Sequence, residues 1–402
     1  MTLELNQVAI QVKAMGRSMA DQTVSRNEAA QAAQQLLDQF STAYTALDER
    51  ITRAEIVQQK QRFDWVGAAP TGEALFQSYP LPPCPERVTV MASDGSQILP
   101  DRHAITLYYL INVGSIIYRH GSNRKPDIYS PKPRLCYEPD DLFDEQGRLI
   151  SSGEVNVKRD LAELETLTHL APAYTRAAPE PVIALLDGQL TLRVIDLPFD
   201  QQQVCQELYV DMLNSLRESR ALLAGYVDRP RSSFVTALMH LASLEPEAIT
   251  EASLRQNPFR HLTDLDVLDF IGPGERSAIF TVRAKGLEKY NQAGHTIHFF
   301  YLNVGQSQSQ SHLARVEVPA WLAADRPALD ILHAALVRQA RLTGGYPYVL
   351  ARAHELALIS GEEREAVELM LAVEMRRQGL IPALSAKQFN KTLLAKKESF
   401  KL

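Results

Sequence analysis

Two similar stretches decide the fold: VMASDGSQI at residues 90–98 and VIALLDGQL at residues 182–190. Each contains an apolar run typical of a buried strand, and each run reaches an aspartate followed by glycine, at Asp94 and at Asp187. Glycine permits a sharp departure of the backbone, so we expect each aspartate at the carboxyl end of its strand, where open α/β sheets place their ligand crevice. Asp-Gly is also common turn chemistry, but two copies after two such strands favour a paired-carboxylate site.

The surrounding pattern predicts an α/β protein with a mixed sheet and flanking helices. Residues 105–121, ITLYYLINVGSIIYRHG, contain two β-rich runs and predict a hairpin that turns at residues 112–114. No sequence period of 20–50 residues recurs, which argues against repeat architectures. Further strands are expected at residues 276–282, 295–305 and 312–319, and helices at residues 157–171, 201–225, 327–342, 347–359 and 362–378.

The two ends of the chain differ from its centre in composition. Residues 1–69 contain no proline, and an apolar stripe from Leu36 to Ile51 at spacings of three and four predicts a long helix or helical hairpin. That stripe needs a cover, from the main body or from a partner chain. Prolines then crowd into a segment that cannot be helical. We therefore expect an N-terminal helical region (1–69), a Pro-rich linker (70–86), a main domain (87–360) and a C-terminal helix with a basic tail (361–402).

Composition excludes several classes of protein. The chain has 402 residues, of which 45% are hydrophobic and 22% charged, so it has ample apolar material for a core. No apolar run reaches the roughly 18 residues that span a bilayer, and the N-terminus lacks the pattern of a signal peptide. Three scattered cysteines exclude a disulfide framework and a cysteine-based zinc cluster. We expect a cytoplasmic protein with no membrane partner.

The charge distribution bears on a nucleic-acid partner. The formal net charge of −6 argues against a protein that simply coats DNA, but it does not exclude an enzyme with a local basic channel. Residues 376–402 hold seven basic residues and one glutamate, a net charge of +6. This tail is either an ordinary solvated end or a segment that contacts phosphates, and the sequence leaves both readings open.

Carboxylates at neighbouring strand ends repel each other unless a cation lies between them. Mg²⁺ and Mn²⁺ prefer oxygen ligands, and two such ions can activate a water and stabilise the leaving oxygen of a phosphodiester. A third carboxylate is expected from the helix at residues 157–171, whose leucine stripe places Glu163 inside its apolar arc and Glu165 at the outer edge. We predict Glu163 as the third ligand, with Glu165 as the alternative; both can also be solvated helix charges.

Two further residues are weak candidates when taken alone. His354 shares a predicted helical face with Leu350 and Leu358, and such a histidine usually packs in a core. Tyr346 precedes Pro347 at the expected start of the same helix, where a tyrosine is usually a packing residue. The chain has no P-loop, no GxSxG and no HExxH motif, so nucleotide motors, α/β-hydrolases and zincins are not indicated.

Taken in order, these motifs resemble the NurA nuclease family. The resemblance runs from about residue 85 to about residue 360, and its most specific part is the YPxxLxxAH spacing of Tyr346 and His354. One departure is the Gly-Gln-Leu after Asp187, where Gly-Ser-Leu is commoner in the family. The motifs are VMASDGSQI, the helix with Arg159 and Glu163, VIALLDGQL, GERSAIF, FFYLNVG, ARVEVP and GYPYVLARAHELAL.

The resemblance implies an RNase H-like core and a Mn²⁺- or Mg²⁺-dependent deoxyribonuclease with two ions per site. Asp94, Glu163, Asp187 and His354 would be the metal ligands, and Tyr346 would complete the catalytic set. The implied substrates are single- and double-stranded DNA ends, cut by a 5′–3′ exonuclease, a single-strand endonuclease or both. The implied partners are a second copy of the chain and a HerA-type hexameric ATPase, in DNA end processing and double-strand break repair.

Two other functions remain as alternatives at this point. One is a non-catalytic adaptor that keeps the RNase H-like fold and docks onto a ring ATPase. The adaptor would be favoured by the loss of one of the three carboxylates, and Asp94, Glu163 and Asp187 are all present. The other is a phosphatase-like hydrolase of small phosphates, which needs a compact pocket rather than a DNA channel.

Overall fold

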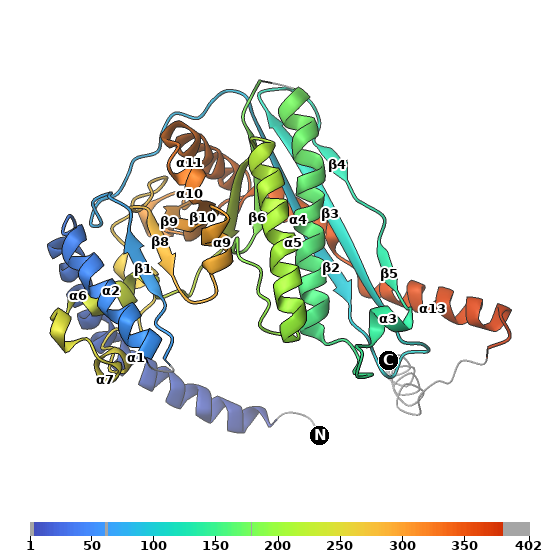
Figure 1. Cartoon of the computed structure of the whole chain (residues 1–402), viewed down its shortest axis with the longest axis horizontal. Helices are drawn as coiled ribbons and strands as arrows, with labels where there is room; N and C mark the ends of the chain where they lie inside the picture. The colour runs from blue at the N-terminus through green and yellow to red at the C-terminus, as the bar shows by residue number, and fades with distance from the viewer. Residues whose placement is uncertain (1–3, 61–62, 178, 381–402) are drawn as a thin grey trace. The chain divides into compact units, whose positions relative to one another are not determined.

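The structure is a computed structural model that describes residues 4–60, 63–177 and 179–380. The chain falls into two compact units. Unit 1 comprises Met1–Cys84 and Ala224–Pro347, and unit 2 comprises Pro85–Leu223 and Tyr348–Leu402. Strands and helices alternate along the chain (Figure 1), and the strands pair in both parallel and antiparallel fashion. The predicted α/β class, with a mixed sheet, flanking helices and an N-terminal helical stretch, is confirmed.

Unit 2 contains the strands that hold the two Asp-Gly motifs. Its strands lie in the order β4-β3-β2-β6, with β5 paired to β3. β2 is antiparallel to β3 and parallel to β6, because the long helix α4 carries the chain back to the starting edge between them. The bounds are β2 Val88–Ile98, β3 Tyr109–His120, β4 Asp127–Tyr129, β5 Arg134–Cys136, β6 Val182–Asp187, α3 Pro139–Leu142 and α4 Ser152–Ala177.

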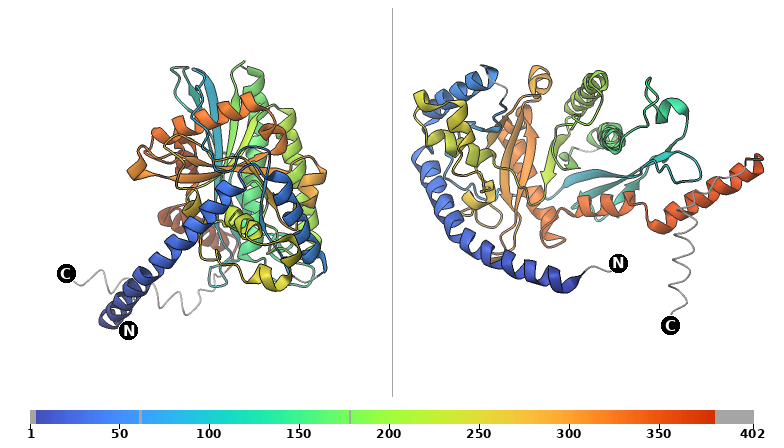
Figure 2. Two further views of the ribbon diagram at one scale, coloured as in Figure 1. Left: turned by 90° about the vertical axis from the view of Figure 1, so that its left-hand side faces the viewer. Right: turned by 90° about the horizontal axis from the view of Figure 1, so that it is seen from below.

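Helices cover both faces of these strands. In Figure 2 (right), α4 and α5 (Phe199–Glu218) lie on one face and α12 (Tyr348–Ala357) lies on the other. Side chains alternate along β2, as they must in a strand. Gln97 donates to Asn156 of α4 at 2.8 Å, whereas Ser96 donates to the carbonyl oxygen of Ala357 in α12. β2 is therefore contacted from both sides just beyond Asp94.

α12 rests directly on the backbone of β3. A Cβ atom at Gly114 would lie 2.6 Å from the backbone nitrogen of Ala357, so only glycine allows this approach. Gly114 is paired with Asp94 in the register of β2 and β3. Asn112 also donates to the Ala357 carbonyl, which lies in the last turn, where carbonyls lack partners within the helix. These contacts fix α12 over the part of β2 that contains Asp94.

Unit 1 contains antiparallel strands in the order β1-β8-β9-β10-β7. The strand β7 begins in unit 2 and pairs with β10 through its later residues. The strand bounds are β1 Gly67–Pro70, β7 Leu222–Val227, β8 Phe280–Arg283, β9 Ile297–Asn303 and β10 Leu313–Pro319. The helix bounds are α1 Leu5–Gln39, α2 Tyr44–Lys60, α6 Phe234–Ala242, α7 Glu251–Arg255, α8 Asp264–Val267, α9 Glu288–Gln292, α10 Ala320–Ala323 and α11 Arg326–Arg341, with short 3-10 turns at Pro246–Ala248 and Gln308–Gln310.

The N-terminal apolar stripe lies on two helices rather than one. Helix α1 ends at Gln39 and α2 begins at Tyr44, so the stripe is divided between the end of α1 and the start of α2. Leu37, Leu47 and Ile51 are nevertheless buried in one core with α6 of the same unit. The stripe is thus covered by its own chain, which removes the need for a second chain at this place.

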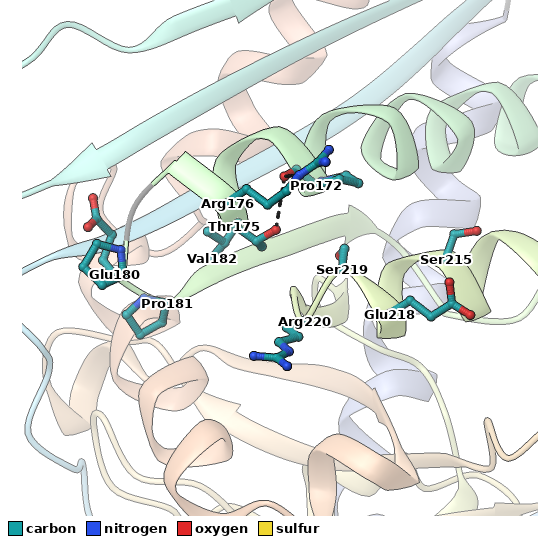
Figure 3. Close-up of a pocket in the computed structure, with 11 residues that line it drawn as sticks. Pro172, Thr175, Arg176, Glu180, Pro181, Val182, Ser215, Glu218, Ser219 and Arg220 are labelled. Carbon is teal, nitrogen blue, oxygen red and sulfur yellow. Dashed lines mark hydrogen bonds between the residues drawn. The ribbon is translucent and has the colours of Figure 1, made fainter.

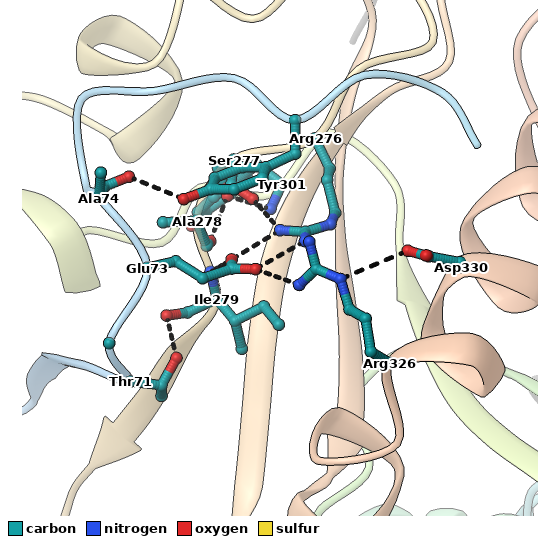
Figure 4. A network of polar contacts seen from close by, with 12 residues as sticks. Thr71, Glu73, Ala74, Arg276, Ser277, Ala278, Ile279, Tyr301, Arg326 and Asp330 are labelled. Carbon is teal, nitrogen blue, oxygen red and sulfur yellow. Dashed lines mark hydrogen bonds and ion pairs between the residues drawn. The ribbon is translucent and has the colours of Figure 1, made fainter.

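The Pro-rich segment is held within unit 1 by an ion cluster around the buried Arg276 (Figure 4). Arg276, whose side chain is 1% exposed, donates through both terminal nitrogens to Glu73 at 2.8 Å. Arg326 pairs with the same carboxylate, and Tyr79 stacks 4.4 Å from the Arg276 guanidinium carbon. These pairings, together with the hydrogen bond from Ile279, lower the pKa of Glu73 against the opposing effect of its burial, which is the larger single influence. The segment is not helical, as its prolines require.

Two element predictions were wrong. The hairpin expected at residues 112–114 is a single continuous strand, β3, because Asn112 and Gly114 serve the contact with α12 rather than a turn. The helix expected at residues 201–225 ends at Glu218, and the chain then enters β7. At the C-terminal end, α13 spans Gly361–Arg377; most of the basic tail, from residue 381 on, lies outside the described residues. Within the described ranges, no helix is long and apolar enough to cross a membrane.

Candidate active site

The register of β2 and β6 brings Asp94 and Asp187 together. The parallel pairs run from Thr89 with Val182 to Ser93 with Leu186, so Asp94 and Asp187 are the next residues on adjacent strands. Neighbouring strands lie about 4.8 Å apart. β6 ends at Asp187 as expected, and Gly188 at a φ of 115° turns the chain away.

Asp94 does not end its strand, contrary to the sequence expectation. β2 continues to Ile98, because residues 94–98 remain paired with β3 after the parallel pairing with β6 has finished. The carboxyl end of the β2–β6 pairing is therefore the point where β2 passes from two strand partners to one. From Asp94 onward, no strand among the described residues is paired to the edge of β2 that faced β6.

A cavity of about 480 Å³ opens at this point. It gathers four carboxylates from three elements of unit 2, together with three groups that can be cationic. Asp94 and Asp187 come from the strands, Asp160 and Glu163 from α4. The groups that can be cationic are Arg159 of α4, Arg193 of the segment after β6, and His354 of α12.

Glu163 is the most buried of these carboxylates. Its residue is 7% exposed, and burial raises the pKa of its carboxyl well above the ordinary value, with the charge of Asp160 adding to the shift and Arg159 opposing it. Oε1 of Glu163 is buried and accepts no hydrogen bond, although Arg159 Nε lies 3.1 Å away. Leaving a buried oxygen without a hydrogen bond costs folding free energy. This oxygen would therefore be stabilised by a further donor or by a cation.

Glu165 lies outside the cavity. Its side chain is exposed and pairs with Arg134, which also comes from the surface of unit 2. The helical-wheel argument thus gave the right register for α4: Glu163 turns inward and Glu165 outward. That Glu163 rather than Glu165 binds a metal stays a prediction.

His354 contacts Asp94 directly. Nδ1 of His354 lies 2.7 Å from Oδ2 of Asp94, and the histidine side chain is 63% exposed. The expectation of a shared apolar face was wrong, because Leu350 is buried whereas His354 and Leu358 are exposed. A core-packing role for His354 is inconsistent with this exposure. Tyr346 belongs to unit 1, where its ring packs edge-on against Tyr226 at 5.7 Å.

The donor set fits a hard divalent cation. Four carboxylates converge on one cavity, and one of their oxygens is buried without a hydrogen bond. Oxygen ligands of this kind are those that Mg²⁺ and Mn²⁺ prefer. As the side chains stand, however, no three His, Cys, Asp or Glu residues in the described part of the chain are close enough to hold one ion. Asp94 contacts His354 and Glu163 contacts Arg159, so metal binding requires side chains of this cluster to move closer together.

Comparison with protein families identifies the family of the chain. The NurA domain model matches residues 88–359, more than half of the chain, and the match includes all five predicted site residues. The chain belongs to the NurA family. Membership makes it a nuclease-family protein. A search of curated proteins gives no match.

Sequence reasoning missed one acidic residue of the carboxylate cavity and gave no separate role to its Arg159. Asp160 lines the cavity, and burial raises the pKa of its carboxyl, with Arg159 opposing. Arg159 had been noted only as part of a family motif. The signal was present in the spacing, because Arg159 and Asp160 lie four and three residues before Glu163 and so share its face of α4.

The NurA domain also has a larger cavity at another place (Figure 3). It has a volume of about 740 Å³ and lies where β6 begins, at the opposite end of that strand from Asp187. Arg176 and Arg220 line it, but Glu180 and Glu218 offset their charges. Its size alone does not make it the site, because it lacks the gathered carboxylates of the smaller cavity.

The buried Glu163 predicts a pH-dependent stability. Its raised pKa means that the folded protein holds this proton more tightly than the unfolded chain, so stability falls as the pH rises from the ordinary carboxyl value through the raised one. We expect Glu163→Gln to raise the melting temperature in EDTA at pH 8, and the difference to vanish near about pH 4, where both states are protonated. Glu165→Gln is the control and should melt like wild type at both pH values. Equal melting temperatures of wild type and Glu163→Gln at pH 8 would show that the buried Glu163 carboxylate does not destabilise the folded protein.

Proposed function

We propose that this chain is a Mn²⁺- or Mg²⁺-dependent deoxyribonuclease that hydrolyses phosphodiester bonds by a two-metal mechanism. The observation that carries the proposal is the cavity where the β2–β6 pairing ends, which gathers Asp94, Asp160, Glu163 and Asp187 within a NurA domain. Membership of the NurA family supports the nuclease class, and the donor set supports the metal dependence. Asp94, Glu163, Asp187 and His354 are the proposed ligands.

The chain's own residues prepare the site in distinct ways. The contact of His354 Nδ1 with Asp94 favours the tautomer that carries its proton on Nδ1, which leaves Nε2 as the ligand atom. Glu163 offers its buried Oε1, and Asp187 offers a carboxylate at the exposed end of β6. Bound divalent cations would activate a water and stabilise the leaving oxygen of the phosphodiester. The family resemblance alone gives Tyr346 the proposed role of orienting that water or a phosphate oxygen through its hydroxyl.

The substrate and the biological setting follow from the family. We propose single- and double-stranded DNA ends as substrates, cut by 5′–3′ exonuclease action, single-strand endonuclease action or both. The setting would be DNA end processing and double-strand break repair in the cytoplasm, with a HerA-type hexameric ATPase as partner. NurA membership is the support for each of these points.

We also propose that the chain is a homodimer. The Leu36–Ile51 stripe no longer supports this, since its core residues are buried within unit 1, so the family resemblance alone carries the dimer. Light scattering at micromolar concentration should give twice the mass of the chain, and addition of the ATPase should give a larger complex. A strict monomer would remove the dimer from the proposal without affecting the nuclease assignment.

Loss of either Asp94 or Asp187 should abolish cleavage while preserving the fold. End-labelled single- and double-stranded DNA is incubated with purified protein in Mn²⁺ or in EDTA. We expect cleavage only with Mn²⁺, and a loss of at least about 100-fold for Asp94→Ala and for Asp187→Ala, because transition-state charge stabilisation goes with the ligand. Their melting temperatures in EDTA should stay the same or rise, since carboxylate repulsion is relieved.

Two outcomes would contradict the nuclease proposal. Near-normal cleavage by Asp94→Ala or by Asp187→Ala would exclude a two-metal site that uses both aspartates as ligands. Clean wild-type protein that never cuts DNA under any metal condition would instead favour the non-catalytic adaptor that docks onto a ring ATPase.

His354 should act as a ligand whose loss extra metal can partly restore. We expect His354→Ala to cut slowly at low Mn²⁺ and faster as Mn²⁺ is raised, because its exposed ring supports Asp94 and metal binding rather than the core. Tyr346→Phe is the comparison, with a lower rate and an unchanged Mn²⁺ requirement. Cleavage is measured per folded molecule across a Mn²⁺ titration, and a full rate from folded His354→Ala would remove it from the site.

A further inference from the structure

Arg159 is a cation built into the carboxylate cavity. Its Nη2 lies 2.7 Å from Oδ1 of Asp160, its Nε lies 3.1 Å from Oε1 of Glu163, and its Nη1 donates to Oε1 of Gln97 at 3.2 Å. One guanidinium therefore contacts two of the four carboxylates and a side chain of β2. Its pairing with Glu163 comes from an i,i+4 spacing on one face of α4.

The contact between α4 and β2 is built around this arginine. A Cβ atom at Gly95 would lie 2.6 Å from Cγ of Arg159 and 2.7 Å from Oε1 of Glu163. Glycine next to Asp94 is thus what lets both side chains lie against the strand. The Arg159 side chain is 29% exposed and that of Glu163 9%, so their interaction is screened less than a surface pair.

The position of Arg159 coincides with the place where a cation is needed. Four carboxylates line the cavity, and Arg159 is half-enclosed among them; the other lining arginine, Arg193, is 72% exposed and lies 3.8 Å from Asp196. An arginine stays protonated at any accessible pH. Its charge therefore stabilises the carboxylates whenever no metal does so. It also lies beside Oε1 of Glu163, the buried oxygen without a hydrogen bond.

We propose that Arg159 is a positioning residue that acts as the resident counter-ion of the metal-free site and competes with the catalytic cation for Glu163. In the metal-free protein it holds Glu163 against Gly95 of β2. Glu163 would be the carboxylate available to a bound divalent cation, and Arg159 would keep its pairing with Asp160. This inference rests on the proposed metal dependence and adds the residue that sets how tightly the metal is held.

The competition predicts that loss of the Arg159 charge lowers the stability of the metal-free protein but raises its affinity for metal. Removing the charge of Arg159 destabilises the metal-free protein, because four carboxylates lose their nearest permanent cation. The same change tightens metal binding, because a positive charge beside Glu163 no longer repels the incoming ion. A purely structural arginine would behave differently, since its loss would destabilise the protein with and without metal and leave the metal affinity equal or weaker.

The test compares Arg159→Gln with Lys158→Gln. Lys158 is the neighbouring position on the same helix, exposed and outside the cavity lining, so it controls for the loss of one positive charge on α4. Melting temperatures are measured in EDTA and in saturating Mn²⁺, and the Mn²⁺ dissociation constant is measured by calorimetry without DNA. We expect Arg159→Gln to melt lower in EDTA, to recover with Mn²⁺ and to bind Mn²⁺ about tenfold more tightly. Lys158→Gln should match wild type in all three measurements.

Further variants cover the remaining outcomes. Arg159→Lys keeps the charge and should restore a wild-type Mn²⁺ affinity with part of the stability. Arg159→Met, a second neutral variant, should behave like Arg159→Gln; if both neutral variants fold only in Mn²⁺, the counter-ion role is supported. Unchanged or weaker Mn²⁺ binding by a folded neutral variant would overturn the proposal, as would failure of both to fold even with Mn²⁺. If wild-type protein binds neither Mn²⁺ nor Mg²⁺, the proposed metal-dependent function is contradicted. If wild type binds metal but the neutral Arg159 variants do not bind it more tightly, only the role of Arg159 is contradicted.

Discussion

The parallel pairing of β2 with β6 is the constraint on which the candidate site depends. It ends with Ser93 beside Leu186, so the next residue on each strand is an aspartate, and two like charges lie on adjacent strands. Such a pair is unfavourable without nearby positive charge. Two helices bring partners to the cluster: α4 brings the Arg159 guanidinium to Glu163 and Asp160, and α12 brings the His354 imidazole to Asp94.

Two glycines let the helices come close enough to do this. Gly95 leaves room on one face of β2 for the stem of Arg159 and the carboxylate of Glu163, and Gly114 leaves room for the backbone of α12 against β3. The register places Gly114 opposite Asp94, the residue before Gly95. Both close approaches therefore occur around a single residue, Asp94. The absence of a side chain at Gly95 and at Gly114 thus lets elements pack closely around Asp94.

The sequence predicted the parts of the site that depend on local patterns. The apolar run of β6 marked where Asp187 ends its strand, and the leucine spacing of α4 separated the inward Glu163 from the outward Glu165. What failed depended on distant contacts. β2 does not stop near Asp94 because β3 keeps it paired, and the apparent turn in β3 is a docking surface for α12. The face of His354 could not be read from α12 alone, because it is set by what that helix packs against.

The permanent positive charge lies where burial is deepest. Asp187 ends β6 in an exposed position. Asp94, whose side chain is 14% exposed, contacts Nδ1 of His354. Glu163, whose side chain is 9% exposed, is the most buried carboxylate of the cavity, and it shares with Asp160 a guanidinium that is always charged. The cost of desolvation is highest at Glu163, so a fixed cation beside it is what the cluster needs if it is to stay folded before any metal arrives.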